Sequence, residues 1–172
     1  MEASYSIIRK ESEYRISLTP MMLDVLSETL QNTIRKRGID ISELIIDRVC
    51  GESTTGQDIL HDITGWVADI FAANPNMIVY YSCDDMMPIP SRNNNSGNKE
   101  LPVNEYRSRL FSHIFESYMS SHQVSGVTNT PIRLDNYDNG KGYSIFIHFI
   151  ARNLHEDIVE KLKEEIKEVS GK

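Results

Sequence analysis

Two adjacent carboxylates and two nearby arginines are the residues of this sequence best suited to chemistry. Asp84 and Asp85 directly follow the apolar run 77–83. Arg107 and Arg109 fall in the first turns of the helix expected after it. Paired carboxylates can hold a metal ion or act as acid and base, and a helix N-terminus with guanidinium groups can hold an anion. Ligands of open α/β sheets bind beyond the carboxyl ends of the strands, so these four side chains form a candidate ligand-binding site.

The same four residues also admit a structural interpretation. The aspartates can simply end a strand and pair with the arginines, and no phosphate-binding or dinucleotide-binding glycine pattern accompanies them. The loop at about 86–103 is longer than an ordinary connection and contains the polar tract SRNNNSGNK, so we expect it to be flexible. We prefer the structural interpretation and keep the ligand site as the alternative.

A second candidate surface is apolar. It comprises the residues that begin the same loop, Met86, Met87, Pro88 and Pro90. Such a patch can contact a protein partner or pack back over the edge of the sheet, and the sequence leaves both interpretations open.

The cysteines and histidines give weaker signals. Cys50 and Cys83 form no C-x-x-C pair, and no spacing supplies a base to either, so we expect buried, reduced thiols. His148 lies inside the last predicted strand, where a hydrogen-bonded structural histidine is expected.

One helix face carries three possible metal ligands, Asp58, His61 and Asp62. No second group of ligands accompanies them, so the pattern is typical of a polar helix face. The sequence predicts no metal and no cofactor.

Composition places the chain among globular proteins of one domain. It has 172 residues, of which 40% are hydrophobic and 25% charged, and we interpret 1–172 as a single domain. The formal net charge of -7 disfavours binding to nucleic acid. The basic cluster Arg35, Lys36 and Arg37 precedes Gly38 and is typical of a helix C-terminus. No secretory signal or membrane-spanning run is recognisable, so we expect a cytoplasmic protein with no membrane association.

Hydrophobic periodicity predicts an α/β (α+β mixed) fold. An N-terminal hairpin is followed by a helix beginning at Thr19-Pro20 and ending at Gly38, and by a strand over 44–50. A helix that stops before Pro75, the strand 77–83 and a long helix come next. A hairpin turning at Asp138-Asn139-Gly140 and a helix capped by Asn153 complete the order ββ-α-β-α-β-α-ββ-α. This order predicts a single mixed sheet of about six strands packed by about four helices.

The run 77–83 is apolar or aromatic at nearly every position. A strand of this kind is covered on both faces. We expect Val79 and Tyr81 on one face of a central strand, with Ile78 and Tyr80 on the other.

The middle third of the chain resembles a small family of uncharacterised bacterial proteins. The resemblance rests on IVYYSCDD, an aromatic strand ending in Cys-Asp, and on RSRLF at the start of a helix, although the loop between them is longer here than in that pattern. The resemblance implies a bacterial cytoplasmic origin. It implies no activity and assigns no catalytic residue.

The sequence therefore predicts a non-enzymatic protein that binds an unidentified protein partner or associates with its own copy. The alternative is a small-molecule or phosphoester-processing enzyme, with its site at the C-terminal end of the central strand.

Overall fold

The computed structural model describes residues 2–9, 12–50, 57–83, 102–135 and 144–170. Its elements are β1 (Ala3–Arg9), β2 (Ser12–Pro20), the 3-10 helix η1 (Leu23–Val25), α1 (Glu28–Arg37), β3 (Asp40–Cys50), α2 (Gln57–Ala73), β4 (Met77–Cys83), α3 (Val103–Ser121), β5 (Val127–Asp135), β6 (Ser144–Arg152), the 3-10 helix η2 (Asn153–His155) and α4 (Glu156–Ser170). The described part of the chain thus has the predicted order of strands and α-helices.

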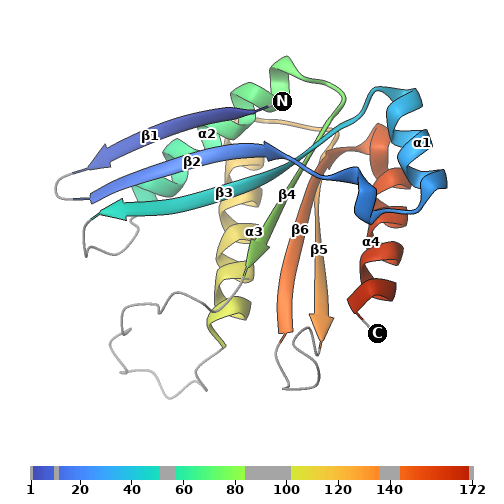
Figure 1. The fold of residues 1–172 in the computed structure, drawn as a ribbon. Helices are drawn as coiled ribbons and strands as arrows, with labels where there is room; N and C mark the ends of the chain where they lie inside the picture. The colour runs from blue at the N-terminus through green and yellow to red at the C-terminus, as the bar shows by residue number, and fades with distance from the viewer. Residues whose placement is uncertain (1, 10–11, 51–56, 84–101, 136–143, 171–172) are drawn as a thin grey trace.

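The six strands form one mixed sheet in the order β1-β2-β3-β4-β6-β5, as predicted. β3 and β4 are parallel, and α2 is the crossover between them; the other neighbouring pairs are antiparallel. Figure 1 shows the strong twist of the sheet, with β1 to β3 running across the view and β5 and β6 running down it. Parallel pairing is therefore confined to the middle of the sheet.

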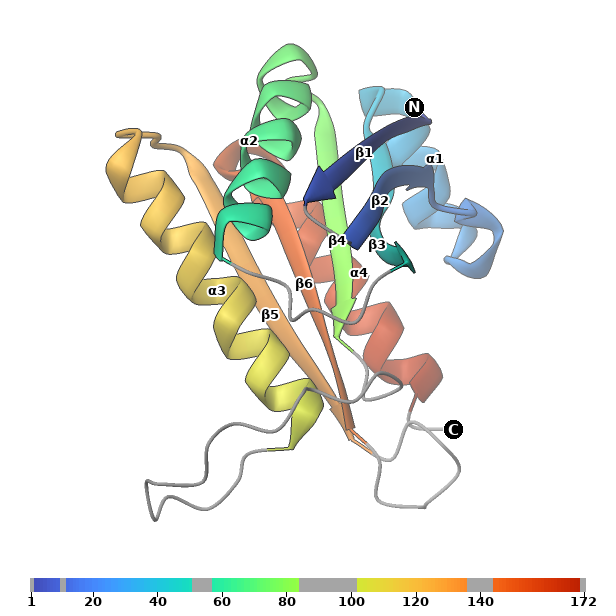
Figure 2. The same ribbon diagram turned by 90° about the vertical axis from the view of Figure 1, so that its left-hand side faces the viewer.

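Helices cover both faces of the sheet. α1 and α4 lie on one face, and α2 and α3 lie on the other (Figure 2). The first layer buries apolar residues of its helices, including Leu30, Ile34, Ile158 and Leu162. The second buries Ile59, Ile63, Val67 and Phe71 of α2 and partly buries Phe111 and Phe115 of α3. No described helix has the length and apolar character needed to cross a bilayer.

β4 lies between these two layers. Ile78 and Tyr80 pack in the layer of α1 and α4, whereas Val79 and Tyr81 pack in the layer of α2 and α3. Ile78 and Val79 are each 0% exposed. The prediction of a central strand covered on both faces is confirmed.

The predicted start of the first helix is wrong. Thr19 and Pro20 belong to β2 and pair with β3, and α1 begins eight residues after Pro20. Ser27 is its N-cap, and the Ser27 hydroxyl accepts a hydrogen bond from the Leu30 N–H at 3.3 Å. Thr-Pro has the composition of a helix start, but the pairing with β3 overrides this local preference.

Pro20 fits this strand because its backbone nitrogen, which carries no hydrogen, points away from β3. The Met21 N–H donates to the Ile41 carbonyl of β3 at 2.8 Å. Backbone groups alternate in direction along an antiparallel strand, so the nitrogen of Pro20 points away from β3 and no β2–β3 bond is lost.

The ends of the two helices on the first face agree only in part with the sequence. Gly38 ends α1 as predicted, with φ 61° and its N–H bonded to the Ile34 and Arg35 carbonyls. Asn153, predicted to cap the last helix directly, instead begins η2, and α4 starts at Glu156. The predicted turn 138–140 lies outside the described residues. Of the predicted loop at about 86–103, only residues 102 and 103 are described, and Val103 already belongs to α3.

Two glycines give a matched test of this backbone. Gly38 has a left-handed conformation that costs an L-residue about 1 kcal/mol, whereas Gly65 lies within α2, where alanine is favoured by up to about 1 kcal/mol. A Cβ at either position meets no atom within 4 Å. We expect Gly38→Ala to lower the free energy of unfolding and Gly65→Ala to raise it. Urea denaturation measures both, and shifts of the same sign would contradict the assignment.

Candidate functional site

Most of the predicted ligand site and the whole predicted apolar patch lie outside the described residues. These are Asp84, Asp85, Met86, Met87, Pro88 and Pro90. Both surfaces therefore stay predictions.

The two predicted arginines lie on the first half of α3. Arg107 is half-buried, and Arg109 is exposed. The Arg109 guanidinium donates to Glu105 Oε1 one turn earlier, at 2.7 Å. An exposed helical pair of this kind stabilises the fold by about 0.5 kcal/mol at most. Arg109 therefore stays at the surface of α3, where its side chain also borders a pocket.

α3 is fixed to the sheet at its start by Asn104. Its side chain is 5% exposed, and Asn104 Nδ2 donates to the carbonyl of Ser144, the first residue of β6. Asn104 Oδ1 accepts from the Glu105 N–H at 2.8 Å. Both polar ends of this buried amide are thereby satisfied, and the first turn of α3 is held beside β6.

A chain of polar side chains lies between α3 and the sheet, one turn further along the helix. Ser108 Oγ lies 2.9 Å from His148 Nε2, and His148 Nδ1 lies 3.0 Å from Asn129 Oδ1. Asn129 Nδ2 in turn donates to Ser112 Oγ at 3.2 Å. Residues from α3, β5 and β6 thus form one connected hydrogen-bond network, which we call the Ser108 network.

Burial keeps His148 neutral, and the Ser108 network decides which ring nitrogen carries the proton. Burial lowers the pKa of His148 to about 4, and its side chain is 0% exposed, with the Phe111 ring 4.9 Å away. The imidazole is therefore neutral near pH 7. Because Asn129 Oδ1 only accepts, Nδ1 carries the proton, and Nε2 accepts from the Ser108 hydroxyl. The prediction of a hydrogen-bonded histidine at this position is confirmed.

A pocket of about 440 Å³ borders the network between α3 and β5. It is lined by Ser108, Arg109, Ser112, His113, Glu116, Pro131, Arg133 and Phe146. Arg133 is held at its rim, because its Nε donates to Asp135 at 2.7 Å and its guanidinium lies 5.9 Å from the centre of the Phe146 ring. The pocket therefore brings two serine side chains and two guanidinium groups to one side of the edge strand β5.

The β5 edge of the sheet is unsuited to pairing with another strand. The Asn153 N–H donates to the Gly126 carbonyl at 2.9 Å, so even-numbered residues of β5 point their backbone groups toward β6. Pro131 therefore points outward, in the middle of the strand, where it offers no N–H. Proline and charged side chains are devices that prevent edge pairing, and β5 also carries the exposed Arg133 and Asp135.

The β1 edge lacks such protection in its middle. The backbone N–H and C=O groups of odd-numbered residues of β2 point toward β3, so those of even-numbered residues point toward β1. The β1 residues that pair with them are Ala3, Tyr5 and Ile7. The backbone groups of Ser4 and Ser6 therefore point outward at the edge. Residues 3–8 include no proline and no charged side chain. This edge is a ready acceptor for a further strand.

Exposed apolar side chains accompany the β1 edge. Tyr5 is 43% exposed and stacks on Trp66 of α2, with the ring centres 6.0 Å apart. Ile8 is 67% exposed on the opposite face of the strand. An edge strand with exposed apolar residues is a typical site of association with another chain.

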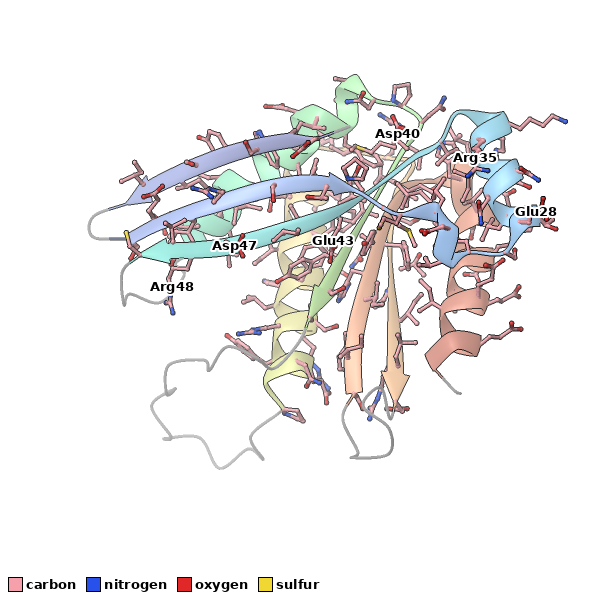
Figure 3. The ribbon with its side chains drawn as sticks, in the orientation of Figure 1. Glu28, Arg35, Asp40, Glu43, Asp47 and Arg48 are labelled. Carbon is pink, nitrogen blue, oxygen red and sulfur yellow. The ribbon has the colours of Figure 1, made fainter. Side chains whose placement is uncertain are left out.

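Charged side chains of β2 and β3 lie on the face of the sheet that points away from α2. Figure 3 shows Glu43 and Asp47 along β3, from the middle of the sheet toward its outer end. Arg15 of β2 is the register partner of Asp47. Tyr80 donates to Glu43 at 3.2 Å, and burial together with Glu43 raises the pKa of Tyr80.

The remaining candidates do not converge on a second site. Cys83 is buried as predicted, but Cys50 is exposed, because the last residues of β3 extend beyond the core. The predicted polar face of α2 carries an exposed His61. Within the described ranges, no three or more His, Cys, Asp and Glu side chains are grouped closely enough to hold a metal ion.

The sequence alone did not reveal the Ser108 network. Its three elements are joined by the fold, and Ser108 and Asn129 are 21 residues apart in the chain. A polar His148 within the apolar strand β6 was the available signal, because a buried imidazole needs hydrogen-bond partners. The protected and open edges of the sheet also required the strand order, which local patterns do not fix.

Comparison with known proteins found no family model, no curated protein and no solved structure that matches this chain. The resemblance of the middle third to bacterial proteins, and the cytoplasmic location that it favours, stay predictions.

The low pKa of His148 predicts a pH dependence of stability. The unfolded chain binds a proton at this residue near pH 6.5, and the folded protein binds it only near pH 4. The contribution of the neutral His148 to the free energy of unfolding is therefore complete above pH 6.5. As the pH falls to 4, the free energy of unfolding decreases by about 3 kcal/mol. We expect chemical denaturation to show this loss in the wild type.

His148→Gln is the matched variant, because it removes the titrating group and keeps hydrogen-bonding capacity. Burial also lowers the pKa of His155, but this residue is present in both proteins and cancels in the difference. An equal pH dependence in wild type and His148→Gln would contradict a buried neutral His148.

Proposed function

We propose that this protein is a self-associating module whose partner is a second copy of the same chain, bound along the β1 edge. The observation that carries the proposal is the contrast between the two edges of the sheet. The backbone groups of Ser4 and Ser6 point outward from β1, and residues 3–8 include no charged residue or proline, whereas β5 carries Pro131 in its middle. Natural sheets protect the edge strands that must not pair with another chain. A sheet with one protected and one unprotected edge therefore supports strand pairing at the unprotected edge.

A two-fold axis at Tyr5 pairs the middle residues of the two strands. Two antiparallel copies of β1 then place Ser4 of each copy opposite Ser6 of the other, where the outward N–H and C=O groups can bond in both directions. Ala3 lies opposite Ile7 in the same register. The backbone groups that form these bonds belong to Ser4 and Ser6, and the β1–β2 register shows that they point away from β2.

Pairing in this register also buries the exposed ring of Tyr5. The two copies of Tyr5 become direct cross-strand neighbours at the axis, each already stacked on its own Trp66. Aromatic cross-strand pairs stabilise a sheet by about 0.2–1 kcal/mol each. The proposed contact therefore combines backbone bonds with burial of side chains that are exposed in the single chain.

Closure at two copies follows from the blocked edge. Once β1 of each copy is paired, the outer edges of the joined sheet are the two β5 strands, and each of these carries Pro131. The proposed assembly is therefore a dimer with one continuous sheet and does not extend further.

Light scattering coupled to size exclusion tests the proposal. We expect a species of twice the chain mass of 19.7 kDa that dissociates on dilution. Ser6→Pro removes an outward N–H and leaves the β1–β2 bonds in place, so it should give a folded monomer. Ser6→Thr is the matched control, because it keeps the N–H and a strand-forming residue, and it should remain dimeric.

Two results would oppose the proposal. One is a wild type that stays at the mass of a single chain at every concentration tested. The other is a Ser6→Pro variant that is folded by circular dichroism and still dimeric.

A further inference from the structure

The Ser108 network joins a nucleophile, a base and a positioning group. Ser108 is 6% exposed, borders the pocket between α3 and β5, and places its Oγ 2.9 Å from His148 Nε2. This distance lies within the range required for proton transfer from a nucleophile to its base. Ser108 therefore contacts the imidazole of His148 and is also one of the residues that line the pocket.

The imidazole has the tautomer that a general base requires. Asn129 Oδ1 accepts the Nδ1 proton at 3.0 Å, which leaves the lone pair of Nε2 directed at Ser108. Asn129 is itself oriented, because its Nδ2 donates to Ser112. A serine, a histidine and an acceptor that orients the histidine form the arrangement by which unrelated folds activate a serine.

Ser112 supplies a donor on the same side of the pocket. It lies one helical turn after Ser108, and both residues line the cavity. Ser112 Oγ accepts from Asn129, so its own proton remains available to a further acceptor. A hydroxyl donor beside the nucleophile can stabilise the negative charge that develops on a carbonyl oxygen during attack.

We propose that Ser108 is the nucleophile of an esterase site in the pocket between α3 and β5, with His148 as general base, Asn129 as its positioning residue and Ser112 as oxyanion donor. The substrate class is a small activated carboxylic ester. The pocket is an open depression of about 440 Å³, and Pro131 and Phe146 give it apolar walls.

The reaction needs only the ester and water. Ser108 Oγ attacks the carbonyl carbon as its proton passes to His148 Nε2, and the carbonyl oxygen takes the negative charge. The carbon–oxygen bond to the leaving group then breaks, and His148 returns the proton to the departing alcohol. Water, deprotonated by the same nitrogen, attacks the Ser108 ester and releases the carboxylic acid, which restores the free hydroxyl and the neutral imidazole.

The buried base explains the choice of activated esters. A neutral imidazole with a low pKa is available at all pH values near 7, but it is a weaker base than an imidazole in water. Attack through such a base is slow on esters with poor leaving groups. Aryl esters and phosphonofluoridates, whose leaving groups depart readily, are therefore the appropriate probes.

A fluorophosphonate probe tests the assignment on the full-length wild-type protein. Ser108 displaces fluoride and forms a stable phosphonyl ester, which intact mass and peptide mapping locate directly. We expect one adduct, at Ser108, and release of p-nitrophenol from p-nitrophenyl acetate that the probe blocks. His148→Gln should lower the labelling rate about 100-fold or more.

Ser117 provides the matched control. It is an exposed serine on the same helix, so Ser117→Ala should leave labelling unchanged, whereas Ser108→Ala should abolish it. Thermal melting shows that each variant is folded, and mapping of the wild-type adduct requires no variant. The proposal is overturned if wild-type Ser108 takes no adduct, if Ser117 is labelled as fast as Ser108, or if folded His148→Gln is labelled at the wild-type rate. The monomeric Ser6→Pro protein should keep the reaction, which separates this test from that of self-association.

Discussion

Burial of β4 on both faces is the constraint on which the rest of the structure depends. A strand with Ile78 and Val79 both fully buried requires a helical layer on each side. The right-handed crossover rule for parallel strands then places α2 on one face, and α1 and α4 complete the other. The antiparallel strands on either side extend this centre, and the outermost of them become the two edges whose chemistry differs.

The same constraint creates the conditions for the Ser108 network. Covering the second face brings α3 over β6, where it removes His148 from water and forces each ring nitrogen to find a protein partner. Ser108 and Asn129 satisfy these nitrogens, so the network stabilises the packing of α3 whether or not Ser108 reacts. Ser108 and Ser112 of the network also line the pocket between α3 and β5. The same residues thus provide a polar contact within the core and form part of the lining of a pocket.

The sequence predicted the elements well because each is encoded locally. The apolar run at β4, the helix stop at Gly38 and the two hairpins follow from short patterns, and they gave the correct order and one mixed sheet. Thr19-Pro20 was misassigned because strand pairing with β3 outweighs local preference. The candidate sites were less accessible. Ser108, Asn129 and His148 come together only through the packing of α3 on two strands. That β1 is an edge strand follows only from the strand order of the whole sheet. No local pattern contains that information.

The strand order also has a consequence for how the chain folds. The hairpins join residues that are close in sequence, as in the pairing of Arg9 with Ser12. β4 instead pairs with β6 across a separation of 73 residues, from Ile78 to Ala151. Bringing such distant segments together costs chain entropy before their contacts form, so we expect the hairpins to be structured in the transition state and the β4–β6 pairing to follow. High φ-values at Ile147 with low ones at Val79 would agree with this order, and the reverse would exclude it. The pairing of the central strand β4 with β6 then forms after the hairpins.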